Sequence, residues 1–180
     1  TDVLTLNGTV PDPLMQDCYA RIVTKAREAG VPTILDTHGP ELELGLMAEP
    51  YMVKPNEVEA AELVGFPLDS DAARWRAVDY FHDQGVRLVV LSLGPGGVMV
   101  SDGSERLRVF PPAIKEVNAV GSGDSLVAGI AVGIKRGWPL EQIIVWGVSA
   151  GTANALSWDI GHFTQAEVES ISSRVIVKKA

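Results

Sequence analysis

The order of hydrophobic and polar positions divides the chain into short apolar runs and longer amphipathic stretches, which predicts strands separated by helices. Strands are predicted at 3–6, 31–35, 51–53, 88–91, 98–100 and 106–110. Helices are predicted at 13–29, 40–47, 57–64, 71–84, 122–135, 140–156 and 165–174. Asp12 before Pro13 is typical of a helix start, and Gly30, Gly65 and Gly85 stand where helices end.

Strands that alternate with helices imply right-handed crossovers and a mostly parallel sheet with helices on both faces. The run 88–91 is apolar throughout, which is typical of a strand that is buried on both sides. No Ser- or Pro-rich linker interrupts the chain, so we expect a single three-layer α/β domain over residues 1–180. Ligands bind at the carboxyl ends of the strands in such folds. The loops to search therefore follow Leu6, Leu35, Val53, Leu93 and Val117.

Composition narrows the function. The 180 residues are 46% hydrophobic and 21% charged, which excludes disorder, and no apolar run reaches the roughly 18 residues that a membrane span needs. A formal net charge of −8 without a basic cluster excludes nucleic acid as a partner. The single cysteine, Cys18, excludes an internal disulfide, and the lack of a secretory signal pattern predicts a cytoplasmic protein. The chain begins at Thr1 and almost at once enters a strand pattern, which is compatible with a piece of a longer protein.

The most informative segment is 117–125, which passes from an extended stretch through Gly121 and Gly123 into an apolar helix. Free N–H groups at such a helix start, together with the helix dipole, can bind a phosphate group. Asp124 could then take the proton from a hydroxyl group that attacks phosphorus. The alternative is that Asp124 or Ser122 caps the helix. The pattern leaves these two interpretations evenly balanced.

A second segment, Lys54-Pro55-Asn56-Glu57-Val58-Glu59, lies between a strand and a helix. Asn56 and Glu59 are three residues apart, so they share one side of the first helical turn and could hold waters around Mg²⁺. A capping box explains the same spacing, and the pattern alone favours that cap.

Two further groups of small residues are candidates for nucleotide binding. Glycines in Ser92-Leu93-Gly94-Pro95-Gly96-Gly97 would let a nucleotide lie against the main chain, but a tight turn needs the same residues. Gly147, Gly151 and Asn154 recur at helical spacing and form a face that a flat ring could approach. Packing between helices is the commoner use of such glycines.

These segments, in their order and spacing, resemble the C-terminal portion of a ribokinase-type (PfkB) carbohydrate kinase over essentially the whole chain. The resemblance implies a ribokinase-like fold, ATP and Mg²⁺ as cofactors, and transfer of the γ-phosphoryl group to a sugar or sugar phosphate. It implies that Asp124 is the catalytic base and that Gly121, Ser122 and Gly123 form the anion hole. It assigns Asn56 and Glu59 to Mg²⁺, which they would hold through water molecules. It assigns the nucleotide to Ser92, Gly94, Gly97, Gly147, Gly151 and Asn154.

The opening Thr5-Leu6-Asn7-Gly8-Thr9-Val10-Pro11 and the pair Val117-Asn118 resemble the hexose-phosphate branch, which contains 1-phosphofructokinases and tagatose-6-phosphate kinases. Two departures stand out. Many members carry Asp-Thr where this chain has Asn118-Ala119, which argues against a monovalent-cation site. The N-terminal half and the β-sheet lid of the family have no counterpart, and the sheet face left without a lid is a candidate surface for a homodimer.

The leading hypothesis is therefore an ATP-dependent hexose-phosphate kinase. The alternatives are a non-catalytic nucleotide-binding fragment and a kinase for another sugar or a nucleoside. A dinucleotide-binding oxidoreductase would need Gly-x-Gly-x-x-Gly after the first strand, and Asn7-Gly8-Thr9 does not supply it.

Overall fold

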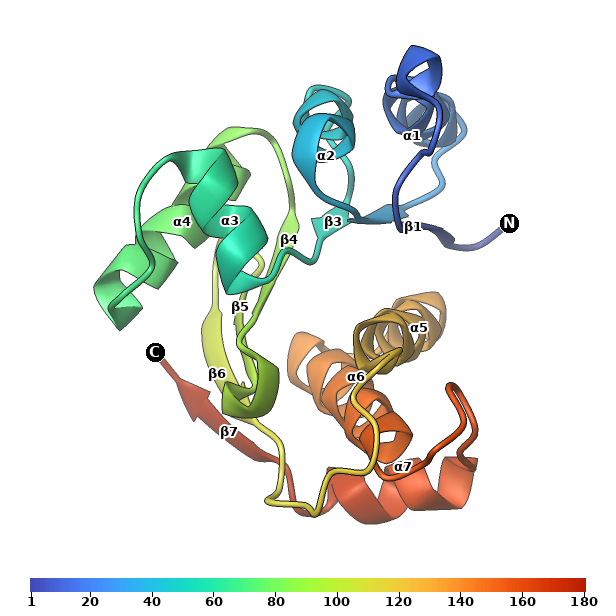
Figure 1. The fold of residues 1–180 in the computed structure, drawn as a ribbon, viewed down its shortest axis with the longest axis vertical. Coiled ribbons are helices and arrows are strands. Elements are labelled where there is room, and N and C mark those ends of the chain that lie inside the picture. The colour runs from blue at the N-terminus through green and yellow to red at the C-terminus, as the bar shows by residue number, and fades with distance from the viewer. The chain divides into compact units, whose positions relative to one another are not determined.

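The computed structural model describes residues 1–180 as an α/β protein (Figure 1). The strands are β1 (Leu4–Asn7), β2 (Thr33–Asp36), β3 (Met52–Val53), β4 (Leu88–Ser92), β5 (Val98–Ser101), β6 (Arg106–Phe110) and β7 (Ile176–Lys179). The helices are α1 (Cys18–Glu28), α2 (Gly39–Leu46), α3 (Glu57–Val64), α4 (Asp71–Asp83), α5 (Ser122–Lys135), α6 (Leu140–Ala155) and α7 (Gln165–Ser172). The strands form one mixed sheet in the order β1-β2-β3-β4-β5-β6-β7, which confirms the predicted fold class.

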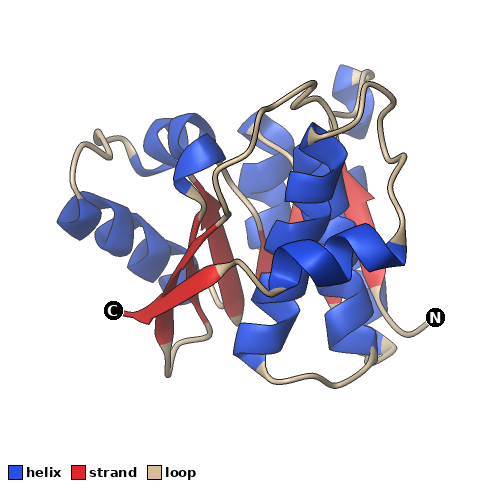
Figure 2. Ribbon diagram, turned by 90° about the horizontal axis from the view of Figure 1, so that it is seen from below, coloured by secondary structure: helices blue, strands red, loops and turns tan.

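The residues group into two compact units. The first unit contains Thr1–Gly94 and Met99–Arg106, and the second contains Pro95–Val98 and Leu107–Ala180. In the first unit, each of the strands β1, β2 and β3 is followed by one or two helices, whereas α5, α6 and α7 follow one another in the second unit. Figure 2 shows the helices in blue and the strands in red. The single domain expected over residues 1–180 stays a prediction.

The first unit is built on the parallel strands β1 to β4. Adjacent strands pair in sequence order, for example Leu6 with Leu35 and Val53 with Val89. When consecutive parallel strands are neighbours, right-handed crossovers place every connecting helix on the same face. Figure 1 shows α1 and α2 together on one side of β1, β2 and β3.

The core of this unit lies between the strands and these helices. Phe81 and Val78 of α4 pack in the same buried cluster as Leu35, Val89 and Leu91. Side chains alternate between the two faces of a strand. Leu88 and Val90 of β4 are also buried, at 2% and 0% exposure, so the prediction of a strand buried on both sides is confirmed.

The first predicted helix is wrong at its start. The carboxylate of Asp12 accepts a hydrogen bond from the N–H of Leu14 at 2.9 Å, but the cap begins only a short 3₁₀ turn, Pro13–Met15. Helix α1 starts later, at Cys18. Leu14 is 91% exposed, so no apolar contact holds the first turn in line with the helix.

In the second unit, α5 packs closely against α6 through glycines. A Cβ at Gly129 would lie 2.8 Å from the Cα of Gly147, and a Cβ at Gly133 would lie 2.9 Å from Cγ1 of Ile143. Both distances are shorter than a methyl group tolerates, so the glycines permit the close approach.

Strand β7 pairs antiparallel with β6 and was not predicted from the sequence. Its register places Val177 opposite Val109 and Lys179 opposite Leu107. Ile176 is 56% exposed, so the strand lacks the apolar pattern of a buried edge. None of the helices combines the length and the hydropathy needed to span a lipid bilayer.

Candidate functional site

In the first unit, the carboxyl ends of β2 and β3 carry a largely buried ion pair. Nζ of Lys54 lies 3.0 Å from Oδ1 of Asp36, and the two side chains are 8% and 14% exposed. Asp36 is the last residue of β2, and Lys54 directly follows β3. Sequence analysis did not select this pair, although the two residues directly follow Leu35 and Val53, after which the fold class predicts ligand-binding loops. The pair marks the carboxyl edge of the sheet, and the predicted site residues of this unit lie at the same edge.

Asn56 and Glu59 form a complete capping box at the start of α3. Oδ1 of Asn56 accepts hydrogen bonds from the N–H groups of Val58 and Glu59 at 2.8 and 2.9 Å, and Oε2 of Glu59 accepts the N–H of Asn56 at 2.8 Å. The capping interpretation is therefore confirmed. A role with Mg²⁺ in addition to the cap stays a prediction.

The structure brings Asn56 and Ser92 together. The two residues form a parallel β-bridge, and the N–H of Ser92 donates to the carbonyl of Pro55 at 2.9 Å. Two of the predicted motifs thus meet at one edge of the sheet, where Oγ of Ser92 also donates to the carbonyl oxygen of Pro55, 37 residues earlier in the chain. This is the carboxyl edge, where parallel sheets bind ligands.

Glycine stands at positions 94 and 97 for different structural reasons. Gly94 begins a short 3₁₀ turn with φ of 55°, and a Cβ there would meet nothing within 4 Å. Gly97 has φ of 84°, and a Cβ there would lie 2.0 Å from the carbonyl oxygen of Val109. Backbone packing alone requires glycine at 97. The predicted contact of both residues with a nucleotide stays a prediction.

In the second unit, Gly121 is the N-cap of α5. It has φ of 80°, in the left-handed region, and makes no side-chain cap hydrogen bond. The N-cap position is therefore occupied by neither Ser122 nor Asp124. Gly123 and Asp124 are exposed in that first turn, so their backbone and side chain face solvent where an anion could approach.

The predicted residues of α6 contact this loop. A Cβ at Gly151 would lie 2.8 Å from the carbonyl oxygen of Ser122, and a Cβ at Gly147 would lie 3.0 Å from that of Leu126. Asn154 is 1% exposed, and its Nδ2 donates to the carbonyl of Val120 at 2.8 Å and to Oγ of Ser122 at 3.1 Å. The structure thus brings Gly151 and Asn154 to the predicted anion hole. Their contact with a nucleotide stays a prediction.

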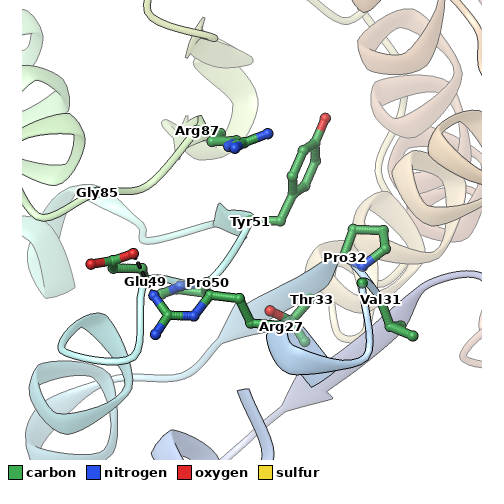
Figure 3. A pocket seen from close by; sticks show the side chains of 10 residues that line it. Arg27, Val31, Pro32, Thr33, Glu49, Pro50, Tyr51, Gly85 and Arg87 are labelled. Carbon is green, nitrogen blue, oxygen red and sulfur yellow. Dashed lines mark hydrogen bonds and ion pairs between the residues drawn. The ribbon is translucent and has the colours of Figure 1, made fainter. Parts of the chain in front are cut away.

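A separate hollow of about 390 Å³ lies in the first unit at the amino ends of β2, β3 and β4 (Figure 3). Arg27 pairs there with Glu49, while Tyr51 and Arg87 stand across from them. None of the predicted site residues lines this hollow. Parallel sheets bind their ligands at the opposite, carboxyl ends of the strands, so we place the candidate site there.

No group of three or more His, Cys, Asp or Glu side chains is arranged to hold a metal ion. Among the predicted site residues, Glu59 lies in the first turn of α3 in the first unit, and Asp124 lies in the first turn of α5 in the second unit. A cation near a lone carboxylate such as that of Glu59 would be bound mainly by water and by substrate oxygens.

Comparison with known proteins agrees with these features. The model of the pfkB family of carbohydrate kinases matches residues 1–159. Tagatose-6-phosphate kinase of Staphylococcus epidermidis is 34% identical over 182 residues, which cover 98% of this chain and 58% of that protein.

Solved structures show the same fold. A putative phosphofructokinase from Staphylococcus aureus matches with a TM-score of 0.91 at 31% identity, covering 99% of this chain and 57% of that one. Phosphofructokinase-2 from Escherichia coli in complex with potassium matches with a TM-score of 0.89 at 26% identity, covering 96% and 56%. The chain thus spans little more than half the length of these relatives. The ribokinase-like fold is confirmed, and the chain belongs to the pfkB family of carbohydrate kinases.

Proposed function

We propose that this chain is the nucleotide-binding and catalytic part of an ATP-dependent hexose-phosphate kinase. The observation that carries the proposal is the start of α5, where Gly121 in the left-handed region exposes a helix N-terminus and Asp124 stands in its first turn. A carboxylate next to an anion site repels a phosphate group, so its presence there calls for a chemical role that outweighs this repulsion. Removing the proton of an attacking hydroxyl group is such a role.

The N–H of Ser122 donates to the carbonyl oxygen of Ala119 at 3.1 Å. In this proposal, the N–H groups of Gly121 and Gly123 bind the phosphoryl group during transfer. Their partial charges add to the positive end of the α5 dipole and stabilise the charge on the equatorial oxygens. Asp124 accepts the proton of the sugar hydroxyl as its oxygen attacks the γ-phosphorus of ATP, and the bond to the β-phosphate oxygen breaks. ADP and a sugar phosphate ester are the products.

The residues of the first unit fit a supporting role with Mg²⁺. The capping box uses Oε2 of Glu59, so the other carboxylate oxygen can accept hydrogen bonds from the waters of a hydrated cation. Asn56 and Glu59 would hold Mg²⁺ through such waters, and the cation would neutralise phosphate charge when bound. Ser92, whose backbone is bridged to Asn56, and Gly94 would lie against the nucleotide.

The acceptor is a hexose phosphate of the fructose-1-phosphate or tagatose-6-phosphate type. Support comes from the 34% identity to a tagatose-6-phosphate kinase and the 31% identity to a putative phosphofructokinase. The relatives are longer, so the assay should use the complete open reading frame that encodes this chain as well as the 180 residues.

The test measures ADP release with fructose 1-phosphate, fructose 6-phosphate and tagatose 6-phosphate as acceptors. Asp124→Asn is expected to lower kcat by about 10² to 10⁴, because general-base catalysis contributes that much, with little change in ATP affinity. Glu141→Gln is the matched control, since Glu141 is also an exposed acidic residue in the first turn of a helix, α6. It should retain full activity.

Two results would contradict the proposal. Near-wild-type turnover of Asp124→Asn would remove this residue from the reaction. ATP binding measured by calorimetry, without ADP release for any of the three acceptors, would instead support nucleotide binding without phosphoryl transfer.

A further inference from the structure

Two asparagine side chains connect the predicted anion hole to the segment after α6. We call residues 118–123 the anion loop and residues 156–161 the following segment; both belong to the second unit. Nδ2 of Asn118 donates to the carbonyl oxygen of Trp158 at 3.1 Å. Asn154, at the end of α6, bonds to both: its Nδ2 donates to the carbonyl of Val120 at 2.8 Å, and its Oδ1 accepts the N–H of Gly161 at 2.7 Å.

The orientation of both amides is fixed by their partners. Oδ1 of Asn118 accepts the N–H of Val120 at 3.0 Å, while its Nδ2 faces a carbonyl oxygen. Turning this amide over would place oxygen against oxygen and an NH₂ group against an N–H. The same holds for Asn154, between the carbonyl of Val120 and the N–H of Gly161.

The hydrogen bonds of these two amides bear on whether the loop can bind a monovalent cation. Phosphofructokinase-2 from Escherichia coli has been solved in complex with potassium. Potassium needs a ring of oxygen ligands, which in proteins are often backbone carbonyls. Here the carbonyls of Val120 and Trp158 accept hydrogen bonds from amide N–H groups. Asn118 is neutral, its Nδ2 cannot ligate a cation, and its Oδ1 already accepts the N–H of Val120. The residues therefore do not fit a monovalent cation.

We propose that Asn118 and Asn154 are positioning residues that hold the anion loop in place without a monovalent cation. The inference rests on the proposed function of the loop as an anion hole. The amide N–H groups supply the partial positive charge that carbonyl oxygens would otherwise obtain from an ion. Backbone hydrogen bonds support the same arrangement, since the N–H of Val117 donates to the carbonyl of Ala155 at 2.8 Å.

The proposal predicts how one substitution changes the response to potassium. Asn118→Asp replaces the N–H donor by a second oxygen and adds a negative charge beside the carbonyl of Trp158. That variant should gain a potassium site. Asn118→Ala loses the same hydrogen bonds without adding a ligand and is the matched control.

The experiment compares unfolding midpoints and ADP affinity in potassium chloride and in tetramethylammonium chloride at equal ionic strength, for the 180-residue chain and the complete reading frame. Wild type and Asn118→Ala should behave alike in both salts. Asn118→Asp should be less stable in tetramethylammonium and recover in potassium, with an unfolding equilibrium constant lowered about tenfold when potassium is about ten times its dissociation constant. Binding of thallium(I), a potassium analogue seen by NMR, should appear only in Asn118→Asp.

Potassium-specific stabilisation of the wild type, or thallium binding to it, would overturn the proposal. So would an Asn118→Asp variant that folds but shows no difference between the salts. Neither readout depends on phosphoryl transfer. A protein without kinase activity would therefore refute the proposed function and leave the cation result standing, while a cation-bound wild type would refute only this inference.

Discussion

Gly151→Ala, a substitution in α6, is expected to distort the proposed anion hole at the start of α5. The new methyl group would lie 2.8 Å from the carbonyl oxygen of Ser122, whereas ordinary contacts begin at 3.4 Å. The opposing atom belongs to the backbone and cannot rotate away. The start of α5 must therefore move by the difference, about 0.6 Å.

The cost in stability is moderate. Inserting a methyl group into a packed interface costs about 1–3 kcal/mol, and alanine in place of glycine returns about 1 kcal/mol of helix propensity. We expect a net loss of about 0–2 kcal/mol in the free energy of unfolding, measured by urea denaturation. Catalytic groups need placement within about 0.5 Å, and an error of 1 Å can cost about 10²-fold. A shift of about 0.6 Å should therefore lower kcat on the order of tenfold.

Gly133→Ala is the matched control, because it adds a methyl group to the same α5–α6 interface. That methyl group would lie 2.9 Å from Cγ1 of Ile143, and residue 133 is about three helical turns from Ser122. Its loss of stability should be similar, but kcat should be unchanged. If both variants lost activity in proportion to their stability, the reasoning that links Gly151 to the loop would be refuted.

Three further predictions concern single side chains. Asn56→Ala should destabilise the protein by about 1 kcal/mol in urea unfolding, whereas Asn56→Ser keeps the cap, so full ADP release by the serine variant would contradict the role with Mg²⁺. Lys54→Met leaves the largely buried carboxylate of Asp36 without its ammonium partner and should cost about 2–4 kcal/mol in the same measurement; an unchanged midpoint would show that the pair contributes nothing. Hydrogen bonds from the backbone N–H and the hydroxyl group of Thr164 hold the pKa of the Glu167 carboxyl below its usual value. Its folded pKa lies below the unfolded one, so its stabilisation is present above the unfolded pKa and disappears as the pH falls through the folded pKa; Glu167→Gln should reduce the acid dependence of the unfolding midpoint.

Local signals predicted the regular elements where a named residue sets their ends. The predicted helix 57–64 agrees with α3 because Asn56 caps its start and Gly65 adopts the left-handed conformation at its end. The predicted strand 106–110 agrees with β6 for a similar reason, since its alternating burial matches the apolar period. Such signals act within a few residues, so the sequence contains them in full.

Other elements depend on contacts that no local pattern contains. Strand β7 forms because β6 offers it an antiparallel partner about 70 residues earlier in the chain, and its own residues are mostly exposed. The start of α1 was misplaced for the opposite reason. Asp12 is a true cap, but without burial of Leu14 its local preference yields only a 3₁₀ turn.

The candidate site shows the same division. Glycine spacing indicated the loop at 121–123, yet it could not separate Gly97, which the backbone of β6 requires, from Gly121, which opens a helix N-terminus. The ion pair between Lys54 and Asp36 was also outside the reach of spacing, because its partners come from different strands.

The role of α6 follows from the hydrogen-bond partners of Asn154. Both N–H groups of its amide are used, one by the carbonyl of Val120 and one by Oγ of Ser122, and the residue is 1% exposed. A direct hydrogen bond from this amide to a nucleotide would have to break one that holds the anion loop. The backbone of Ser122 likewise lies next to Gly151, in the space that a nucleotide base would need. We therefore expect helix α6 to act on the candidate site by positioning the loop. Asn154 would then affect a bound nucleotide only indirectly, through the geometry of residues 120–122.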